Sequence, residues 1–177
     1  MVTTEDQAFL LRTARAVLER KIEEQKVPKQ LLEKRGVFVT LTIDGALRGC
    51  IGELYPVHSI YDAVVENTKR AAYDDSRFPQ VTEREKPLIR IELSILSLPE
   101  AIAYTSQKQL FGLLHNHPGV IIRADDHAAT FLPQVWDTLR DPEEFLSHLC
   151  AKAGLPPNRW KKGVHIELYT VEHFQER

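Results

Sequence analysis

"GVFVTLTIDGALRGCIGEL", residues 36–54, decides the fold more than any other stretch of the chain. β-Branched and aromatic residues flank the pair Asp44-Gly45, and such a pair between two apolar runs is typical of a two-residue type I′ turn. We therefore predict an antiparallel hairpin here. A two-residue loop pairs Val39 with Cys50, so Arg48 and Cys50 lie on the same face as the apolar residues of the first strand.

Helices and further strands surround this hairpin in irregular order. A capping box at Thr4 and Gln7, followed by core-facing apolar residues at helical spacing as far as Ile22, predicts a first helix over residues 5–25. Residues 88–96 alternate between apolar and polar side chains, which is typical of a half-buried strand. Similar patterns predict helices over 59–75, 106–116 and 141–154, with Ser59 as the N-cap of the first and Asp141 as the N-cap of the last. They also predict a second hairpin over 119–132 and a final strand over 164–174.

These elements favour an α+β fold with a mostly antiparallel central sheet flanked by helices, because two hairpins imply antiparallel pairing. A chain of 177 residues has the length of one domain, with room for a smaller second lobe. We therefore treat residues 1–177 as a single domain of two lobes.

Composition argues against several classes of protein. A net charge of −2 and a pI of about 6.4 provide no basic surface for a nucleic acid. The chain has neither an apolar run of about 18 residues nor a signal peptide, so we expect no membrane span. The two cysteines, Cys50 and Cys150, form no C-x-x-C pair, which favours a reducing, cytoplasmic location.

Cys50 allows two interpretations. Arg48 lies two residues away, and a neighbouring cation stabilises a thiolate, so Cys50 could be the nucleophile of an enzyme. Alternatively, Cys50 is a small apolar residue in a packed strand. Arg48 would then form a structural pair with a carboxylate such as Glu53, Glu92 or Asp75.

Two glycines, Gly49 and Gly52, remove side chains from both faces of the strand around Cys50. Glycine inside a strand often marks a bulge or the close approach of a ligand or another backbone. The glycines therefore favour a site at this strand.

We predict no metal site and no cofactor. His115 and His117 have a spacing that binds a metal ion only when a third ligand is supplied, and no cysteine lies near them in the sequence. Two histidines of a surface loop are the simpler interpretation.

Five motifs occur in an order that resembles one known family. They are "LRGCIG" at 47–52, "YDDSRFP" at 73–79, "IELSIL" at 91–96, "TFLPQVW" at 130–136 and "FLSHLCAKAGLPPNRW" at 145–160. The sequence is similar, over nearly its whole length, to the AmmeMemoRadiSam system protein A family, whose eukaryotic relatives carry the AMME chromosomal region domain. The resemblance implies a compact α+β fold with a main lobe and a smaller lobe.

The resemblance also implies site residues and partners. The glycine-flanked Cys-Arg pair and its place in a matching motif together predict Cys50 and Arg48 as the catalytic residues. The matching motifs supply as binding residues Gly49, Gly52, Asp75, Arg77, Phe78, Thr130, Gln134 and Trp136. Bacterial and archaeal members resemble partners of a Memo-like protein and a radical S-adenosylmethionine protein in a shared pathway.

Two functions remain open at this point. In the first, the protein is a cytosolic enzyme or enzyme subunit that acts on an unknown small molecule in a cleft around Cys50, with Arg48 and Arg77 holding an anion. In the second, it is a non-catalytic adaptor that binds the Memo-like and radical S-adenosylmethionine proteins. Charge argues against a third function, binding to RNA or DNA.

Overall fold

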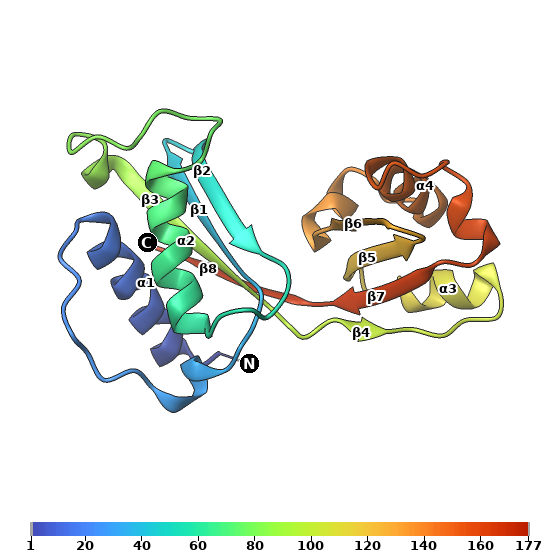
Figure 1. Cartoon of the computed structure of the whole chain (residues 1–177), viewed down its shortest axis with the longest axis horizontal. Helices are drawn as coiled ribbons and strands as arrows, with labels where there is room; N and C mark the ends of the chain where they lie inside the picture. Colours follow the sequence, from blue (N-terminus) through green and yellow to red (C-terminus); the bar gives the residue numbers. More distant parts are fainter. Residues whose placement is uncertain (1, 177) are drawn as a thin grey trace. The chain divides into compact units, whose positions relative to one another are not determined.

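The structure, a computed structural model, describes residues 2–176 and is α+β (Figure 1). The chain folds into two compact units. The first unit extends to Leu98 and resumes at Glu172, and the second comprises Pro99–Val171. Each unit contains its own four-stranded sheet, so the smaller lobe is a sheet-containing unit in its own right.

In the first unit, two helices pack together on one face of a sheet with the strand order β2-β1-β3-β8 (Figure 1). The helices are α1, Thr4–Leu18, and α2, Ile60–Tyr73. The strands are β1, Val37–Ile43; β2, Ala46–Glu53; β3, Ile89–Leu96; and β8, Val171–Gln175. Two short 3-10 helices, Lys29–Leu32 and Lys86–Leu88, complete the unit.

The hairpin of β1 and β2 confirms the prediction for residues 36–54. Asp44 and Gly45 have φ angles of 50° and 79°, as a type I′ turn requires, and Ile43 pairs with Ala46 across it. The alternation predicted for β3 is also confirmed, since its isoleucines and Leu93 are buried in the core against the helices. Ser59 caps α2 by accepting the amide of Asp62, so local signals fixed this helix.

The predicted register of the hairpin was wrong beyond its turn. Thr42 pairs with Leu47, but the next pair is Leu41 with Gly49. Arg48 therefore has no partner in β1 and forms a β-bulge in β2. Cys50 therefore pairs with Thr40 instead of Val39. This one-residue bulge moves Cys50 from the helix-covered face of the sheet to the opposite face.

The first helix is shorter than predicted. Thr3 and Asp6 form the capping box, one position before the predicted pair, and α1 ends at Leu18. Arg20 ends the helix in a left-handed conformation, with φ 58°, a position that favours glycine. Ile22 lies beyond this end and is 40% exposed, so it does not belong to the core as the helical pattern suggested.

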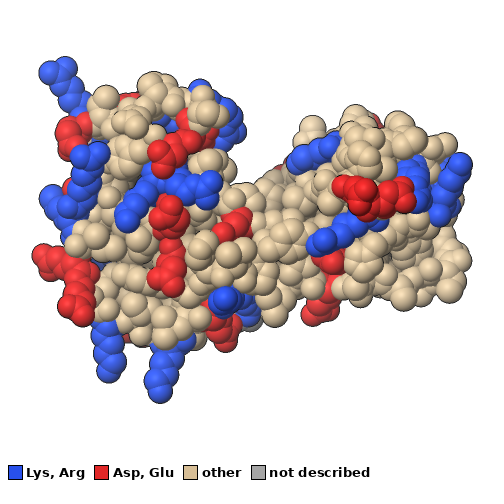
Figure 2. All heavy atoms as spheres, viewed as in Figure 1, with Lys and Arg blue, Asp and Glu red and all other residues tan. Residues whose placement is uncertain are grey.

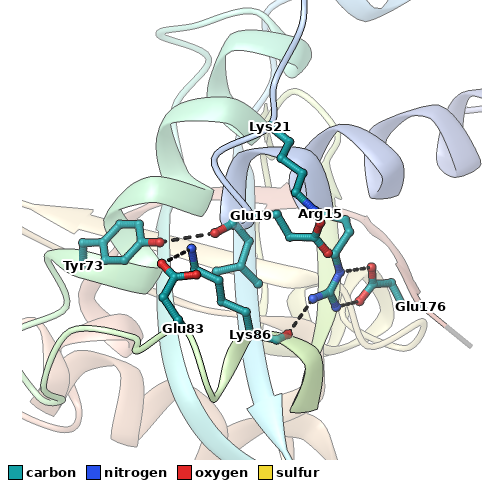
Figure 3. Close-up of polar contacts among 8 residues, drawn as sticks. Arg15, Glu19, Lys21, Tyr73, Glu83, Lys86 and Glu176 are labelled. Atoms are coloured by element: carbon teal, nitrogen blue, oxygen red, sulfur yellow. Dashed lines mark hydrogen bonds and ion pairs between the residues drawn. The ribbon is translucent and has the colours of Figure 1, made fainter.

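Arg15 joins α1 to the last described residues of the chain (Figure 3). Its guanidinium donates to both carboxylate oxygens of Glu176 and to the carbonyls of Lys86 and Ile89. The Glu176 carboxylate in turn accepts the amide of Ile91. This network ties one helix, β3 and the end of the chain together, and charge-assisted bonds of this kind are among the stronger ones in proteins.

The second unit has the strand order β4-β7-β5-β6. Its strands are β4, Glu100–Ala101; β5, Gly119–Ala124; β6, His127–Phe131; and β7, His165–Tyr169. Its helices are α3, Gln107–Leu113, and α4, Pro142–Lys152, with 3-10 helices at Pro133–Asp137 and Arg159–Lys162. The predicted hairpin at 119–132 is confirmed, as is the Asp141 cap of α4.

The final strand predicted over 164–174 is instead two strands. β7 belongs to the sheet of the second unit and β8 to that of the first, with Thr170 between them. An uninterrupted strand-like pattern does not reveal such a division, because the boundary is set by the sheet with which each half pairs.

The second unit buries its own aromatic core. The Trp136 ring stacks on Phe145 with centroids 3.7 Å apart, and Trp160 is 1% exposed. Within residues 2–176, no helix has the length and apolar character needed to span a membrane. Acidic and basic side chains are interspersed on the face of each unit shown in Figure 2.

We predict that Gly49→Ala lowers the free energy of unfolding by about 3 kcal/mol, because overpacking against rigid backbone is costly. The added methyl carbon would lie 2.2 Å from the carbonyl oxygen of Ala71 in α2. In the control, Gly112→Ala in α3, the methyl group meets nothing within 4 Å. This variant should gain about 0.5–1 kcal/mol. Chemical denaturation measures both; equal effects would contradict the close approach of α2 to β2.

Candidate functional site

Asp75 and Arg77 bind the backbone of Cys50 at the edge of the first sheet. The Cys50 amide donates to Asp75 Oδ2 at 2.8 Å, and the Cys50 carbonyl accepts Arg77 Nη2 at 3.0 Å. Arg77 also donates to both carboxylate oxygens of Asp75, at 2.9 and 2.7 Å. Because β2 is an edge strand, this side-chain pair occupies the place that a neighbouring strand would take.

Burial and charge make this pair rigid. The Asp75 side chain is 4% exposed. The Asp75 carboxylate accepts hydrogen bonds from the Arg77 guanidinium and from the Cys50 and Arg77 amides. These bonds hold the pKa of the carboxyl well below its ordinary value, although burial alone would raise it. The carboxylate likewise raises the pKa of Arg77. The Arg77 side chain nevertheless remains 55% exposed and lies over the ring of Phe78, 5.5 Å from its centroid.

The loop after α2 positions these groups. Asp74 ends the helix, and the carbonyl of Asp75 accepts the amide of Phe78 in the turn that follows. Asp75 therefore points toward β2 directly after the helix that packs on that strand. Residues 73–79 therefore connect the end of α2 to the β2 edge of the sheet.

The Cys50 thiol lies on the face of the sheet opposite α2. Cys50 is a half-buried residue, and its sulfur lies 3.4 Å from the Thr40 hydroxyl on the neighbouring strand. The other cysteine, Cys150, is fully buried in the second unit, and this burial raises the pKa of its thiol.

Arg48 pairs with Glu85, a residue that sequence reasoning missed. Arg48 Nε donates to Glu85 Oε1 at 2.7 Å, and Nη2 donates to Oε2 at 3.3 Å. Arg48, together with the amide and hydroxyl of Thr82, lowers the pKa of Glu85 to about 2. The Arg48 side chain is only 11% exposed, so its charge is balanced by a neighbouring carboxylate.

The groups that approach the two glycines closely belong to the protein itself. A β-carbon on Gly49 would lie 2.2 Å from the Ala71 carbonyl oxygen, and one on Gly52 would lie 2.3 Å from the Phe38 ring. The glycine pattern thus marked a real close approach, by a helix on one face and by an aromatic ring on the other.

Three of the predicted site residues, Thr130, Gln134 and Trp136, lie in the second unit. The Thr130 hydroxyl bonds the carbonyl of Val120 and the hydroxyl of Tyr169. Trp136 is 2% exposed and donates its indole N–H to the carbonyl of Pro118 at 2.8 Å. Gln134 is exposed. The structure therefore shows packing and strand-pairing contacts for Thr130 and Trp136.

Metal-ligating residues are not grouped in the described part of the chain: within 2–176, no three His, Cys, Asp or Glu side chains are placed to share an ion. His117 stacks on Trp136, with centroids 5.0 Å apart. His58 lies 3.0 Å from the Glu53 carboxylate.

Comparison with known proteins places these residues in a family. The AMMECR1 family profile matches residues 11–174. The chain belongs to the AMMECR1 family. Protein MJ0810 of Methanocaldococcus jannaschii is 39% identical, with 99% of this chain and 92% of that protein covered. Protein Mbar_A1807 of Methanosarcina barkeri is 36% identical, with 100% and 93% covered.

A solved structure of this family has the same fold. The crystal structure of uncharacterized protein PH0010 from Pyrococcus horikoshii matches with a TM-score of 0.81 and 35% identity, covering 96% of this chain and 90% of that one. This chain therefore shares its α+β architecture with that archaeal protein.

We predict that the Arg48–Glu85 pair makes stability depend on pH. A carboxylate whose pKa is lowered by folding stabilises the protein above its unfolded pKa, and this stabilisation is lost as pH falls through the folded pKa. Glu85→Gln should therefore lower the free energy of unfolding by about 2 kcal/mol at pH 7, with the partial exposure of Glu85 discounted. The difference from wild type should shrink between about pH 5 and pH 2.

Denaturant unfolding at several pH values measures this difference. Glu23→Gln removes the same charge from an exposed residue and controls for net charge. A difference between wild type and Glu85→Gln that stays constant with pH would show that the ion pair contributes nothing.

Proposed function

We propose that this AMMECR1-family protein is a non-catalytic binding subunit that acts in the cytosol and docks a protein partner through Arg77 and Phe78. The proposal rests on the fixed geometry and the exposure of the Arg77 side chain. Its guanidinium is fixed by Asp75 and by the Cys50 carbonyl, yet more than half of its side chain is exposed. An arginine held in one geometry beside an aromatic ring loses little conformational entropy on binding.

Two further features support a binding role. Arginine and aromatic residues dominate the energetics of protein interfaces, and Arg77 and Phe78 form such a pair. Two nearby charged residues are engaged within the protein instead, Arg48 with Glu85 and Asp75 with the edge of β2. The family resemblance suggests Memo-like and radical S-adenosylmethionine proteins as the partners to test first.

We expect Arg77→Ala and Phe78→Ala each to weaken binding to such a partner by about tenfold or more, as interface hot spots do. Purified partner proteins, titrated against wild type and variants, measure the affinity. Arg70→Ala, which removes an exposed arginine from α2, is the matched control and should bind as wild type does. Circular dichroism checks that each variant is folded. Undiminished binding by both variants of the pair would refute docking through this surface.

A second candidate function is an enzyme or enzyme subunit that uses Cys50 on a small molecule. It is favoured by the half-buried position of Cys50 beside the Thr40 hydroxyl, with the Arg77 cation bound to the Cys50 carbonyl. A thiol activated for catalysis reacts faster than an ordinary one.

Alkylation by iodoacetamide distinguishes the two candidates. For a binding subunit, Cys50 should react at pH 7 no faster than the thiol of glutathione, and the buried Cys150 more slowly still. Faster alkylation of Cys50 than of glutathione would favour the enzyme. Loss of pathway turnover in Cys50→Ala with unchanged complex formation would favour it as well.

A further inference from the structure

A groove on the first unit combines two cations with an apolar wall. It encloses about 350 Å³ and lies between the end of α1, the segment after it and the end of α2. The lining residues are Val17, Arg20, Ile22, Lys69, Tyr73 and Asp74. A groove of this volume and composition suits a small ligand that carries both an apolar group and a charge.

Arg20 occupies a backbone position that disfavours its own side chain. Its φ of 58° is left-handed, and the amides of Arg20 and Lys21 close the end of α1 onto the carbonyls of Val17 and Ala16. Glycine adopts this conformation without strain, whereas a β-carbon is crowded there. Strained residues of this kind cluster at binding sites, where the side chain has a use.

The side chain of Arg20 is held over the groove. Its guanidinium lies 5.0 Å from the centroid of the Tyr73 ring, a cation–π contact. The Tyr73 hydroxyl donates to the carbonyl of Leu18, which fixes the ring against the end of α1 (Figure 3). Lys69 lies one helical turn before Tyr73 on α2, so both cations line the same groove.

The positive charges that line the groove outnumber the negative ones. Asp74 is the one acid among the lining residues. Outside the lining, the Glu83 carboxylate accepts a hydrogen bond from the Lys86 amine at 2.7 Å (Figure 3) and also interacts electrostatically with Arg20. The buried Lys86 offsets the charge of Glu83, and among the lining residues the two positive charges of Arg20 and Lys69 exceed the one negative charge of Asp74.

We propose that the groove binds a small organic carboxylate that carries an aryl or alkyl group. Arg20 and Lys69 would bind the carboxylate, and Val17, Ile22 and the edge of Tyr73 would contact the apolar group. The 40% exposure of Ile22 then has a reason, because a ligand would cover it. Neither Arg77 nor Phe78 lines this groove, so the proposal does not depend on the docking of a protein partner.

Benzoate and hexanoate are the probes that test the proposal, with benzylamine as the probe of opposite charge. Amide chemical shifts of the ¹⁵N-labelled protein report binding at Ile22, Tyr73 and Asp74 and give an affinity. We expect both carboxylates to shift these amides with saturable behaviour, and benzylamine to leave them unchanged.

Three variants assign the contacts. Arg20→Gly and Lys69→Gln should each weaken benzoate binding by about fivefold, the effect of one partly exposed ion pair. Arg70→Gln removes a neighbouring exposed cation that does not line the groove, and it should bind benzoate within about twofold of wild type. Arg20→Gly should also keep or raise the melting temperature, because glycine relieves the left-handed strain.

The combination of weaker binding and undiminished stability separates a ligand contact from a structural role. The proposal is overturned if no carboxylate shifts these amides, if benzylamine binds as well as benzoate, or if Arg20→Gly and Arg70→Gln bind benzoate equally.

Discussion

The hydrogen bond from the Cys50 amide to the buried Asp75 carboxylate holds the edge of the first sheet, and the candidate site depends on it. An edge strand exposes amide and carbonyl groups that must be covered or hydrated. Asp75 and Arg77 cover those of Cys50 with one ion pair. The same bond fixes the loop after α2.

The charged residues near β2 differ in how far they are exposed to solvent. Asp75 and Arg48 are almost fully buried and are balanced by partners within the protein. Arg77 is fixed at one end by the same network, yet it keeps its charge exposed to solvent. A rigid, exposed cation next to an aromatic ring is suited to binding a protein partner. The ion pairs of Arg48 and Asp75 instead contribute to the structure of the folded protein.

Much of the fold follows from local signals. The Asp44-Gly45 turn, the Ser59 and Asp141 caps and the alternation of β3 were all predicted from the sequence, because each depends on residues close together in the chain. The predicted register beyond the turn was wrong. The observed register depends on the bulge at Arg48 and on the contact of Gly49 with Ala71, and both are tertiary features. The division of the final strand between two sheets is likewise set by tertiary pairing.

The candidate site was predicted only in part, for a similar reason. The family motifs brought Asp75 and Arg77 into the same hypothesis as Cys50, and the structure joins all three. Glu85, the partner of Arg48, escaped notice because the two are 37 positions apart and lie in no shared motif. The glycines correctly indicated a close approach, although the approaching groups are part of the chain.

Hydrogen exchange of the Cys50 amide tests the central interaction most directly. We expect this amide to be protected in the wild type although it faces outward from an edge strand. In Asp75→Asn its exchange should accelerate by about tenfold or more, since a bond to a buried charge is lost, while the amides of β1 change far less. A Cys50 amide that exchanges as fast as exposed backbone in the wild type, or at an unchanged rate in the variant, would contradict the account.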